Sequence, residues 1–167
     1  CNFSIIPSDG SVTSIGECAF LDCTKLTELN IPDSITNIGG YAFSNCIGLT
    51  SVTIPNSTTS IGEGAFYRCT ELTSITIPKG VKNIEKCAFG YCDIDVDTPE
   101  KCADFTIYGY TGTAAEIYAN ENEFNFVVIC PHNEEFLKEI PAISETCTTN
   151  GYTAGIYCTK CNKYISG

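Results

Sequence analysis

The 167-residue sequence contains no methionine, not even at position 1, and only one histidine. Because a translated chain begins with methionine, we expect this one to be a processed product or a piece excised from a longer protein. A lone imidazole leaves little for the pairing of nucleophile and base that covalent catalysis requires. Gly-x-Ser-x-Gly and phosphate-loop motifs are also missing. These absences favour a protein that is not an enzyme. Paired carboxylates for glycoside cleavage stay open as an alternative, but nothing in the sequence singles out a pair.

Basic residues are scarce as well, since nine Lys and Arg stand against 20 Asp and Glu and the formal net charge is −11. A chain this acidic repels phosphate backbones, so we expect no nucleic-acid partner. Anionic membrane surfaces are disfavoured for the same reason. No apolar run approaches the roughly 18 residues of a membrane-spanning helix, so the sequence also predicts no insertion into a membrane.

Cysteine, in contrast, is abundant, with 12 residues in the chain. Four of them recur at one constant interval, at Cys23, Cys46, Cys69 and Cys92. Such regularity is an architectural signal and marks an internal repeat. Three full copies and a divergent fourth can be aligned. The units lie near residues 12–34, 35–57, 58–80 and 81–110.

Each unit combines two short predicted strands with one compact segment. Alternating apolar and polar residues predict a half-buried strand, which ends at proline because proline cannot donate to a ladder. The Ala-Phe-x-x-Cys segment is predicted to form a single helical turn. One unit has too few apolar residues to fold alone, so about three must stack to build a continuous core. The residues expected to stack on their own copies are Ile15, Ile38, Ile61 and Ile84, then Phe20, Phe43, Phe66 and Phe89, then Leu26, Leu49 and Leu72.

The repeating cysteines are expected to be free, buried thiols at one inward position. A small apolar side chain with a weak donor suits a tight turn in a core, and a bridge between coils would need a specific Cβ geometry. Cys18 and Cys87 fall in a variable column and are predicted to lie on the outer face. Each precedes a repeating cysteine by five residues, so bridges from Cys18 to Cys23 or from Cys87 to Cys92 are the alternative.

The frame Ile-Pro-x-x-(Val/Ile/Thr)-x-x-Ile-x-x-x-Ala-Phe-x-x-Cys-x-x-Leu recurs in register over about residues 3–92. This frame resembles the BspA-like leucine-rich repeat of bacterial surface proteins. The resemblance implies a curved solenoid with a parallel sheet on its concave side. It also implies adhesion or partner binding by a secreted or cell-surface protein. The expected fold class is a repeat solenoid, a leucine-rich-repeat-like right-handed coil of 23-residue units with short parallel strands and short helical turns.

The repeat breaks at residues 93–102, an insertion in which Asp occupies alternate positions. This alternation favours an edge strand whose acidic residues face water. The alternative is a calcium loop, which is less favoured because Thr98 stands where an EF-hand frame needs glycine and no flanking helices are evident. The carboxylates that would fit part of that frame are Asp93, Asp95, Asp97 and Asp104.

Residues 105–129 are predicted to cover the open end of the core. Thr113 and Glu116 have the spacing of a capping box, which would open a short helix that runs to about Asn122. Residues 124–129 are then expected to form a final strand. This segment resembles the terminal unit that follows such repeats in related surface proteins, so the first domain is expected to span residues 1–129.

Residues 130–167 show no trace of the repeat and contain a Cys-x-x-Cys pair, which can present two thiolates to one tetrahedral ion. A segment this short is near or below the size that folds unaided, so a structural zinc ion would supply much of its folding energy. Five candidate ligands compete for four places. The segment resembles small Cys/His modules of bacterial cell-surface proteins, which implies zinc-ribbon-like ligation by His132, Cys147, Cys158 and Cys161, with Cys130 as the alternate. Two disulfides are the alternative, and a redox-active Cys-x-x-Cys is a weaker third.

The predicted partner surface is a flat strip of hydroxyl-rich outward positions on successive strands, which Thr106 continues. We call it the polar strip, and its residues are Thr27, Glu28, Asn30, Thr50, Ser51, Thr53, Thr73, Ser74 and Thr76. The strip lacks the aromatic and arginine anchors typical of binding hot spots. Because threonine suits strands and stacked threonines stabilise a sheet, a purely structural ladder is the alternative.

These features together predict a monomeric, non-catalytic repeat protein that binds a protein or a glycan on a host or neighbouring cell. The alternative is a structural spacer, or an accessory module of a larger secreted enzyme.

Overall fold

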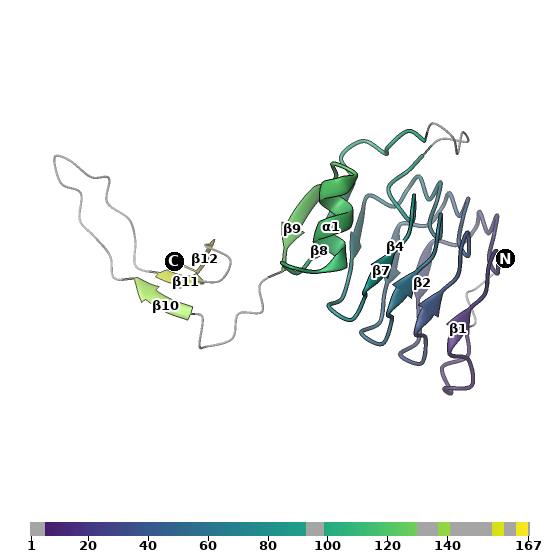
Figure 1. The fold of residues 1–167 in the computed structure, drawn as a ribbon, viewed down its shortest axis with the longest axis horizontal. Helices are drawn as coiled ribbons and strands as arrows, with labels where there is room; N and C mark the ends of the chain where they lie inside the picture. The colour runs from purple at the N-terminus through teal and green to yellow at the C-terminus, as the bar shows by residue number, and fades with distance from the viewer. Residues whose placement is uncertain (1–5, 93–98, 130–136, 141–154, 159–162, 167) are drawn as a thin grey trace. The chain divides into compact units, whose positions relative to one another are not determined.

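The computed structural model describes residues 6–92, 99–129, 137–140, 155–158 and 163–166. The chain divides into two compact units, Cys1–Val127 and Val128–Gly167. The larger unit is a stack of coils with a helix at one end, and the smaller unit contains short strands (Figure 1). Each unit is described below by itself.

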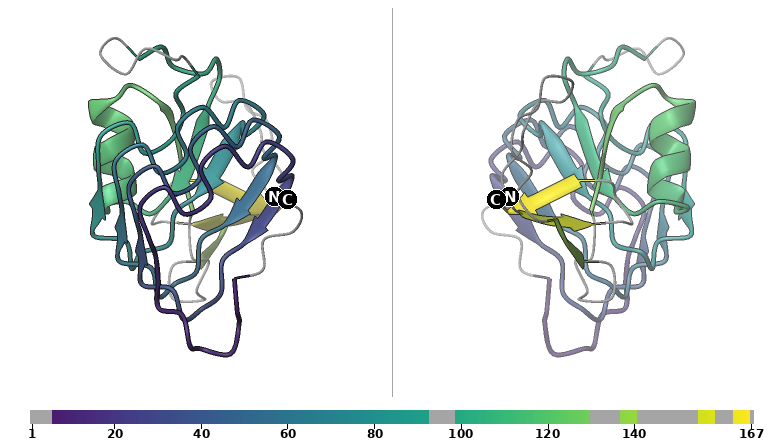
Figure 2. Two further views of the ribbon diagram at one scale, coloured as in Figure 1. Left: turned by 90° about the vertical axis from the view of Figure 1, so that its right-hand side faces the viewer. Right: turned by 90° about the vertical axis from the view of Figure 1, so that its left-hand side faces the viewer.

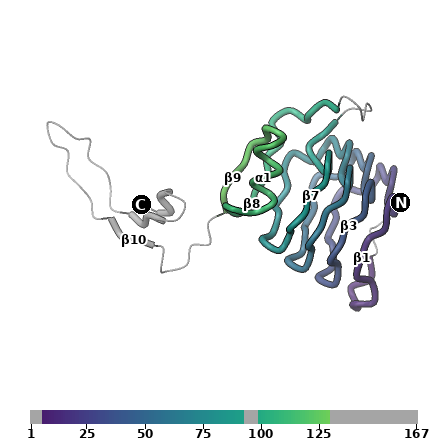
Figure 3. The backbone as a smooth tube through the Cα atoms, viewed as in Figure 1, coloured from purple at the N-terminus to yellow at the C-terminus, as the bar shows by residue number. Residues whose placement is uncertain are grey.

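Two sheets run along the larger unit, and their strands from β1 to β8 pair in parallel. One contains β1 (Ser14–Ile15), β3 (Asn37–Ile38), β5 (Ser60–Ile61) and β7 (Asn83–Ile84), in that order. The other contains β2 (Glu28–Asn30), β4 (Ser51–Thr53), β6 (Ser74–Thr76), β8 (Thr106–Gly109) and β9 (Asn125–Val128). From β1 to β7, paired residues are one repeat length apart, as in Ile15–Ile38 and Ile38–Ile61. The predicted parallel-strand solenoid is therefore confirmed, and its coils can be followed one over another in Figures 2 and 3.

The predicted helical turn at Ala-Phe-x-x-Cys is wrong, because this segment forms consecutive tight turns. In the first coil the N–H groups of Ala19 and Leu21 donate to carbonyls three residues earlier. The alternate N–H groups, such as that of Phe20, donate instead to the next coil, at Ala42 O, 2.7 Å away. A helix uses every N–H within itself. Here half of them hold neighbouring coils together, so a helix cannot form.

The predicted core columns are confirmed except at Phe89, whose ring pairs with those of Phe105 and Tyr118. The Phe20 and Phe43 rings stack with centroids 5.1 Å apart, and the Phe43 and Phe66 rings with centroids 5.2 Å apart. The leucine column is buried, and so are the isoleucines of the first three coils, while Ile84 is half-buried. Each coil therefore buries its apolar side chains against the same residue types of its neighbours.

Two of the repeating cysteines are free and buried, as predicted, namely Cys46 and Cys69. The Cys46 thiol donates to Phe20 O over 3.3 Å, and the Cys69 thiol donates to Phe43 O over 3.3 Å. Burial raises the pKa of Cys46 to about 11, and it raises the pKa of Cys69 further. In these two coils the thiol is a structural donor that ties one coil to the one before.

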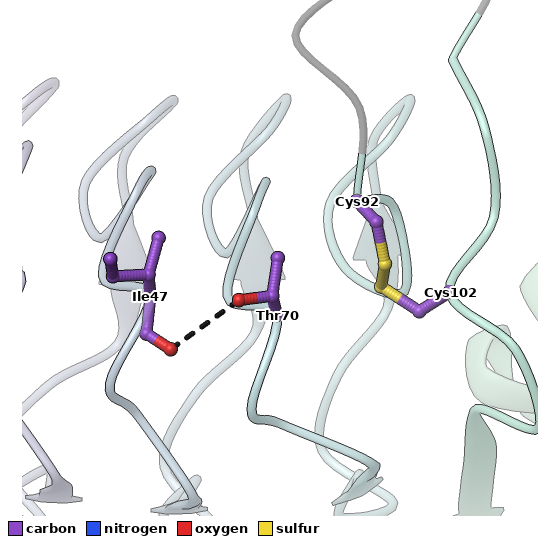
Figure 4. Close-up of a disulfide and its surroundings, with 4 residues drawn as sticks. All are labelled: Ile47, Thr70, Cys92 and Cys102. Atoms are coloured by element: carbon purple, nitrogen blue, oxygen red, sulfur yellow. Dashed lines mark hydrogen bonds between the residues drawn. A yellow bond between two sulfur atoms is a disulfide. The ribbon is translucent and has the colours of Figure 1, made fainter.

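For Cys23 and Cys92 the prediction of free thiols is wrong, because both are disulfide-bonded. Cys92 is joined to Cys102, with Cα atoms 5.2 Å apart (Figure 4). The N–H of Cys92 donates to Glu100 O and that of Cys102 to Gly90 O, so the base of the insertion is an antiparallel pair. This pairing brings the two cysteines together.

A change of register precedes this disulfide. Asn45 N–H donates to Tyr67 O, whereas Arg68 N–H, at the equivalent position one coil later, donates to Tyr91 O instead of Gly90 O. The fourth coil is thus displaced by one residue at Gly90, whose φ is +81°. Cys92 keeps the regular spacing of the repeat in the sequence but loses the structural position of Cys46 and Cys69.

Cys18 and Cys87 are both free, so the alternative bridges to Cys23 and Cys92 are wrong. Cys18 is exposed, as predicted for the outer face. Cys87 is buried, which contradicts the prediction for that residue, because Tyr67 and Tyr91 pack around it and Phe124 from the end of the larger unit covers them.

The end of the stack is closed by α1 (Ala114–Glu121) and β9. Both were predicted to within about two residues, and Asn122 ends the helix. The predicted capping box is wrong, since the Thr113 hydroxyl donates to Tyr110 O. Only Glu116 behaves as in such a box, because its carboxylate accepts a 2.7 Å hydrogen bond from Gly112 N–H. The tight turn at Gly112 places that N–H, instead of the one at the N-cap, within reach of the carboxylate.

The smaller unit contains the antiparallel strands β10 (Leu137–Ile140), β11 (Gly155–Cys158) and β12 (Lys163–Ser166). Cys158 is the last residue of β11 and pairs with Lys163, so the chain reverses direction between them. The other predicted zinc ligands, His132, Cys147 and Cys161, and the alternate Cys130 lie outside the described residues. So do Asp93, Asp95 and Asp97 of the alternative calcium loop.

Candidate interaction surface

The polar strip lies on the outward face of β2, β4 and β6. Alternation along β2 exposes Glu28 and Asn30 and buries Leu29 between them. The same two-residue period applies to the next strands because successive side chains point to opposite faces of a sheet. Eight of the nine strip residues are exposed, and Ser74 is half-buried.

The parallel register arranges the strip residues in rows across the strands. Asn30 pairs with Thr53, Thr53 with Thr76, and Thr76 with Tyr108 of β8. In the neighbouring row Glu28 pairs with Ser51. Since adjacent strands are about 4.8 Å apart, the row from Asn30 to Tyr108 extends about 14 Å along the stack.

One hydroxyl of the strip is structural. Thr50 donates to Thr27 O over 2.9 Å, a bond between equivalent positions of successive coils. Next to the other sheet, the Thr59 hydroxyl donates to Thr36 O in the same way. Within the described residues the hydroxyls of Thr53 and Thr76 make no such bond. The strip therefore contains one hydroxyl, that of Thr50, which links two coils, and a row whose hydroxyls are left for solvent or a ligand.

Tyr108 was not among the predicted site residues, although it completes this row. Its side chain is 38% exposed. Close by in sequence, the Tyr110 ring lies under the Lys79 ammonium, which is 4.5 Å from the ring centroid. Tyr108 stands two positions after Thr106, as Thr53 stands two positions after Ser51. That offset within the strand is the sequence signal that would have found it.

At the other end of the row, Asn30 lines an open groove formed by residues 8–10 and 30–34. Two carboxylates line the groove, Asp9 and Asp33, and none of its lining residues is basic. Hydrogen bonds from the Ser11 hydroxyl and N–H hold the pKa of Asp9 below its ordinary value. Asp9 therefore stays ionised at neutral pH. This groove was not predicted, because its residues come from two different coils.

Other kinds of site find little support in the described part of the chain. Three or more His, Cys, Asp or Glu side chains suited to one metal ion do not meet among the described residues. The predicted calcium residue that is described, Asp104, is exposed on a turn. The helix α1 is too short to cross a membrane, and the described residues hold no other helix that would do so.

This geometry defines a class of protein. A stack of 23-residue coils, each contributing one strand to each of two sheets around a column of leucine, isoleucine and phenylalanine, is a leucine-rich-repeat solenoid. The chain belongs to the BspA-type leucine-rich repeat family, because residues 1–113 match the family described as "BspA type Leucine rich repeat region (6 copies)". The resemblance inferred from the repeat is thereby confirmed.

A solved structure of a similar protein agrees with this fold. A leucine rich cell surface protein from Faecalibacterium prausnitzii is 27% identical, with a TM-score of 0.56 over 78% of this chain and 32% of that one. A leucine-rich repeat protein from Bacteroides ovatus is 29% identical, with a TM-score of 0.43 over 58% of this chain and 35% of that one. The chain spans about a third of the length of these two proteins. No match was found among curated proteins.

Proposed function

We propose that this chain is a non-catalytic interaction protein, secreted or displayed on a bacterial cell, that binds a protein or a glycan through its polar strip. The observation that carries the proposal is the row Asn30, Thr53, Thr76 and Tyr108, which offers unbonded polar groups and one aromatic ring on a flat face. The description of the Faecalibacterium prausnitzii relative as a cell surface protein supports the location.

The strip suits recognition because its backbone is already ordered by the sheet. A rigid surface loses little conformational freedom on binding, so less of the free energy of its polar contacts is offset by ordering. A tyrosine at the end of the row supplies the amphipathic ring that interfaces favour. These features support binding, whereas the Thr50 hydroxyl supports the alternative of a structural spacer.

The test compares two arginine substitutions on opposite sheets. Thr53→Arg places a large charged side chain at the centre of the strip, while Asn37→Arg does the same at an exposed position of β3. The wild-type chain is first applied to arrays of purified extracellular proteins and of glycans. We expect binders whose affinity falls at least about tenfold for Thr53→Arg, roughly the loss of one well-packed contact, and stays unchanged for Asn37→Arg.

Circular dichroism and thermal unfolding show whether both variants keep the fold. Equal effects of the two substitutions would place the contact elsewhere. Arrays without any binder would contradict the proposal and favour a spacer that displays a neighbouring domain.

A further inference from the structure

The sheet that contains β1, β3, β5 and β7 has outward polar side chains that bond one another or a close neighbour. The Ser60 hydroxyl donates to the Asn37 side-chain oxygen, and the Asn83 amide donates to the Glu85 carboxylate over 3.4 Å. Asn37 pairs with Ser60 and Ser60 with Asn83, so the three stand in one row across the strands. A row that satisfies its own polar groups in this way is a structural ladder.

The row Asn30, Thr53, Thr76 and Tyr108 behaves differently, although its strands stack at the same spacing. All four side chains are exposed, and none of them makes a hydrogen bond with any residue in the described part of the chain. Each hydroxyl or amide can therefore donate to and accept from a bound molecule. The contrast between the two sheets favours a ligand-binding row over a structural ladder.

The absence of charge from this row restricts the ligand that it can bind. Glu28 is the one charged residue of the polar strip, and the chain carries a net charge of −11. An anionic ligand would be repelled by the molecule as a whole, and a cationic one would find no carboxylate among the four residues of the row. The row therefore suits a neutral ligand that is rich in hydroxyl groups.

The Tyr108 ring adds an aromatic face at one end of the row. Its side chain is 38% exposed and pairs in register with Thr76, so the ring and a free hydroxyl share one face of the sheet. A pyranose sugar has an apolar face of C–H groups and an edge of hydroxyl groups. An exposed aromatic ring can stack on that face while neighbouring hydroxyls and amides bind the edge.

We propose that this row binds an extended, neutral, β-1,4-linked glycan that crosses the strands along the stack, with one sugar ring on Tyr108. The inference rests on the proposed function, since it names the ligand class of the same surface. One sugar of such a chain is close in length to the spacing between neighbouring strands, about 4.8 Å. Successive sugars can therefore face successive coils. An α-1,4-linked chain coils, so its sugars do not keep this register.

The test uses hexasaccharides of the same composition and different linkage. Cellohexaose and maltohexaose both consist of glucose, joined by β-1,4 bonds in the first and by α-1,4 bonds in the second. Both are titrated into the full chain, as are the β-1,4-linked xylohexaose and mannohexaose, and binding is followed by ¹H–¹⁵N NMR. We expect at least one β-1,4-linked probe to shift the amides of Asn30, Thr53, Thr76 and Tyr108. It should bind at least about tenfold more tightly than maltohexaose, the scale of one good contact.

Substitutions at Tyr108 separate ring stacking from the other contacts. Tyr108→Ala removes the ring, whereas Tyr108→Phe keeps it. The affinity for the β-1,4-linked probe is expected to fall about tenfold in Tyr108→Ala, as loss of one aromatic contact implies, and to fall less in Tyr108→Phe. Ile117→Ala is the control, because Ile117 is 55% exposed on α1, outside the strip, and it should bind as the wild type does. Circular dichroism shows whether the variants keep the fold.

The assignment of the row is overturned if no β-1,4-linked probe shifts these amides, if maltohexaose binds as tightly, or if Tyr108→Ala retains the wild-type affinity. Shifts confined to β1, β3, β5 and β7 would also reject it, because they would place the glycan on the other sheet. Array proteins that lose affinity in Thr53→Arg, while no β-1,4-linked probe binds, would leave the proposed function standing and reject the glycan alone.

Discussion

At the scale of single residues, each coil contains positions whose backbone is left-handed. One column holds Asp22 and Asn45, with φ of 60° at both, and Arg68, with φ of 58°. Asp and Asn tolerate this conformation because their short side chains bond locally. The conformation turns the chain sharply enough for alternate N–H groups to reach the next coil. The sequence shows Asp and Asn at this position, but the left-handed backbone could not be inferred from them because the segment also fits a helical turn.

Arg68 is the poorest residue in this column. A long side chain gains no local bond in the left-handed region, and its Nε atom is buried without a partner within the described residues. We expect Arg68→Asn to raise the free energy of unfolding by about 1 kcal/mol, since it relieves both costs. Urea unfolding of the larger unit measures this change.

Lys82→Asn is the control, because Lys82 is exposed and its backbone is not left-handed. The reverse substitution Asn45→Arg should destabilise the protein, since it also removes the 2.6 Å hydrogen bond from Asn45 to Asp22. An unchanged or lower stability of Arg68→Asn would contradict the argument.

The free thiols should differ in reactivity according to burial. Iodoacetamide at pH 8 is expected to label Cys18, which is exposed, and to leave Cys46 and Cys69 unmodified. With a pKa of about 11, roughly one Cys46 thiol in a thousand is ionised at that pH. Peptide mass spectrometry locates the label, and labelling in guanidinium shows that all three thiols can react. Equal labelling of Cys18 and Cys46 in the native protein would refute the buried thiol column.

At the scale of structural elements, the helix α1 closes the stack by taking the place of a next coil. In the earlier coils the phenylalanine N–H donates to an alanine carbonyl of the next coil, as from Phe66 to Ala88. Phe89 has no such neighbour among the described residues. The Tyr118 hydroxyl of α1 takes this place, accepting from Phe89 N–H over 3.4 Å and donating to Phe89 O over 3.1 Å. Burial raises the pKa of Tyr118, so the hydroxyl keeps its proton.

Tyr118→Phe removes that hydroxyl while keeping the ring, which packs 4.6 Å from the Phe89 centroid. We expect a loss of about 1–3 kcal/mol in the free energy of unfolding, because two buried backbone groups lose their partner. The backbone amide of Phe89 should also exchange its hydrogen faster. Tyr108→Phe, at an exposed tyrosine, is the matched control and should change neither quantity. A Tyr118→Phe variant as stable as that control would show that the cap acts by ring packing alone.

At the scale of the whole molecule, the two units are expected to respond differently to chelation. Zinc ligation by His132, Cys147, Cys158 and Cys161 stays a prediction. We expect about one zinc ion per chain in protein purified without chelator. Its removal should abolish amide protection in β10–β12 and leave that of β1–β8 intact.

Elemental analysis and hydrogen exchange measure both effects. Absence of zinc, with these cysteines unreactive to thiol reagents until reduced, would instead establish the two-disulfide alternative.

The sequence by itself determined the 23-residue period, the inward columns, the order of strands and the helix and strand that close the stack. Residues that recur at one spacing become neighbours simply by stacking, so their contacts can be inferred without coordinates. It also predicted that the strip residues are exposed, which holds for all of them except the half-buried Ser74.

Only the tertiary structure decided the features that depend on contacts at other separations. The bonds between coils turned a predicted helical turn into consecutive tight turns. A shift of one residue at Gly90 moved Cys92 out of the thiol column and toward Cys102. The groove joins Asp9 to Asp33, and the insertion brings Tyr108 beside Thr76. None of these pairs is separated by one repeat length, so the repeat carries no information about them.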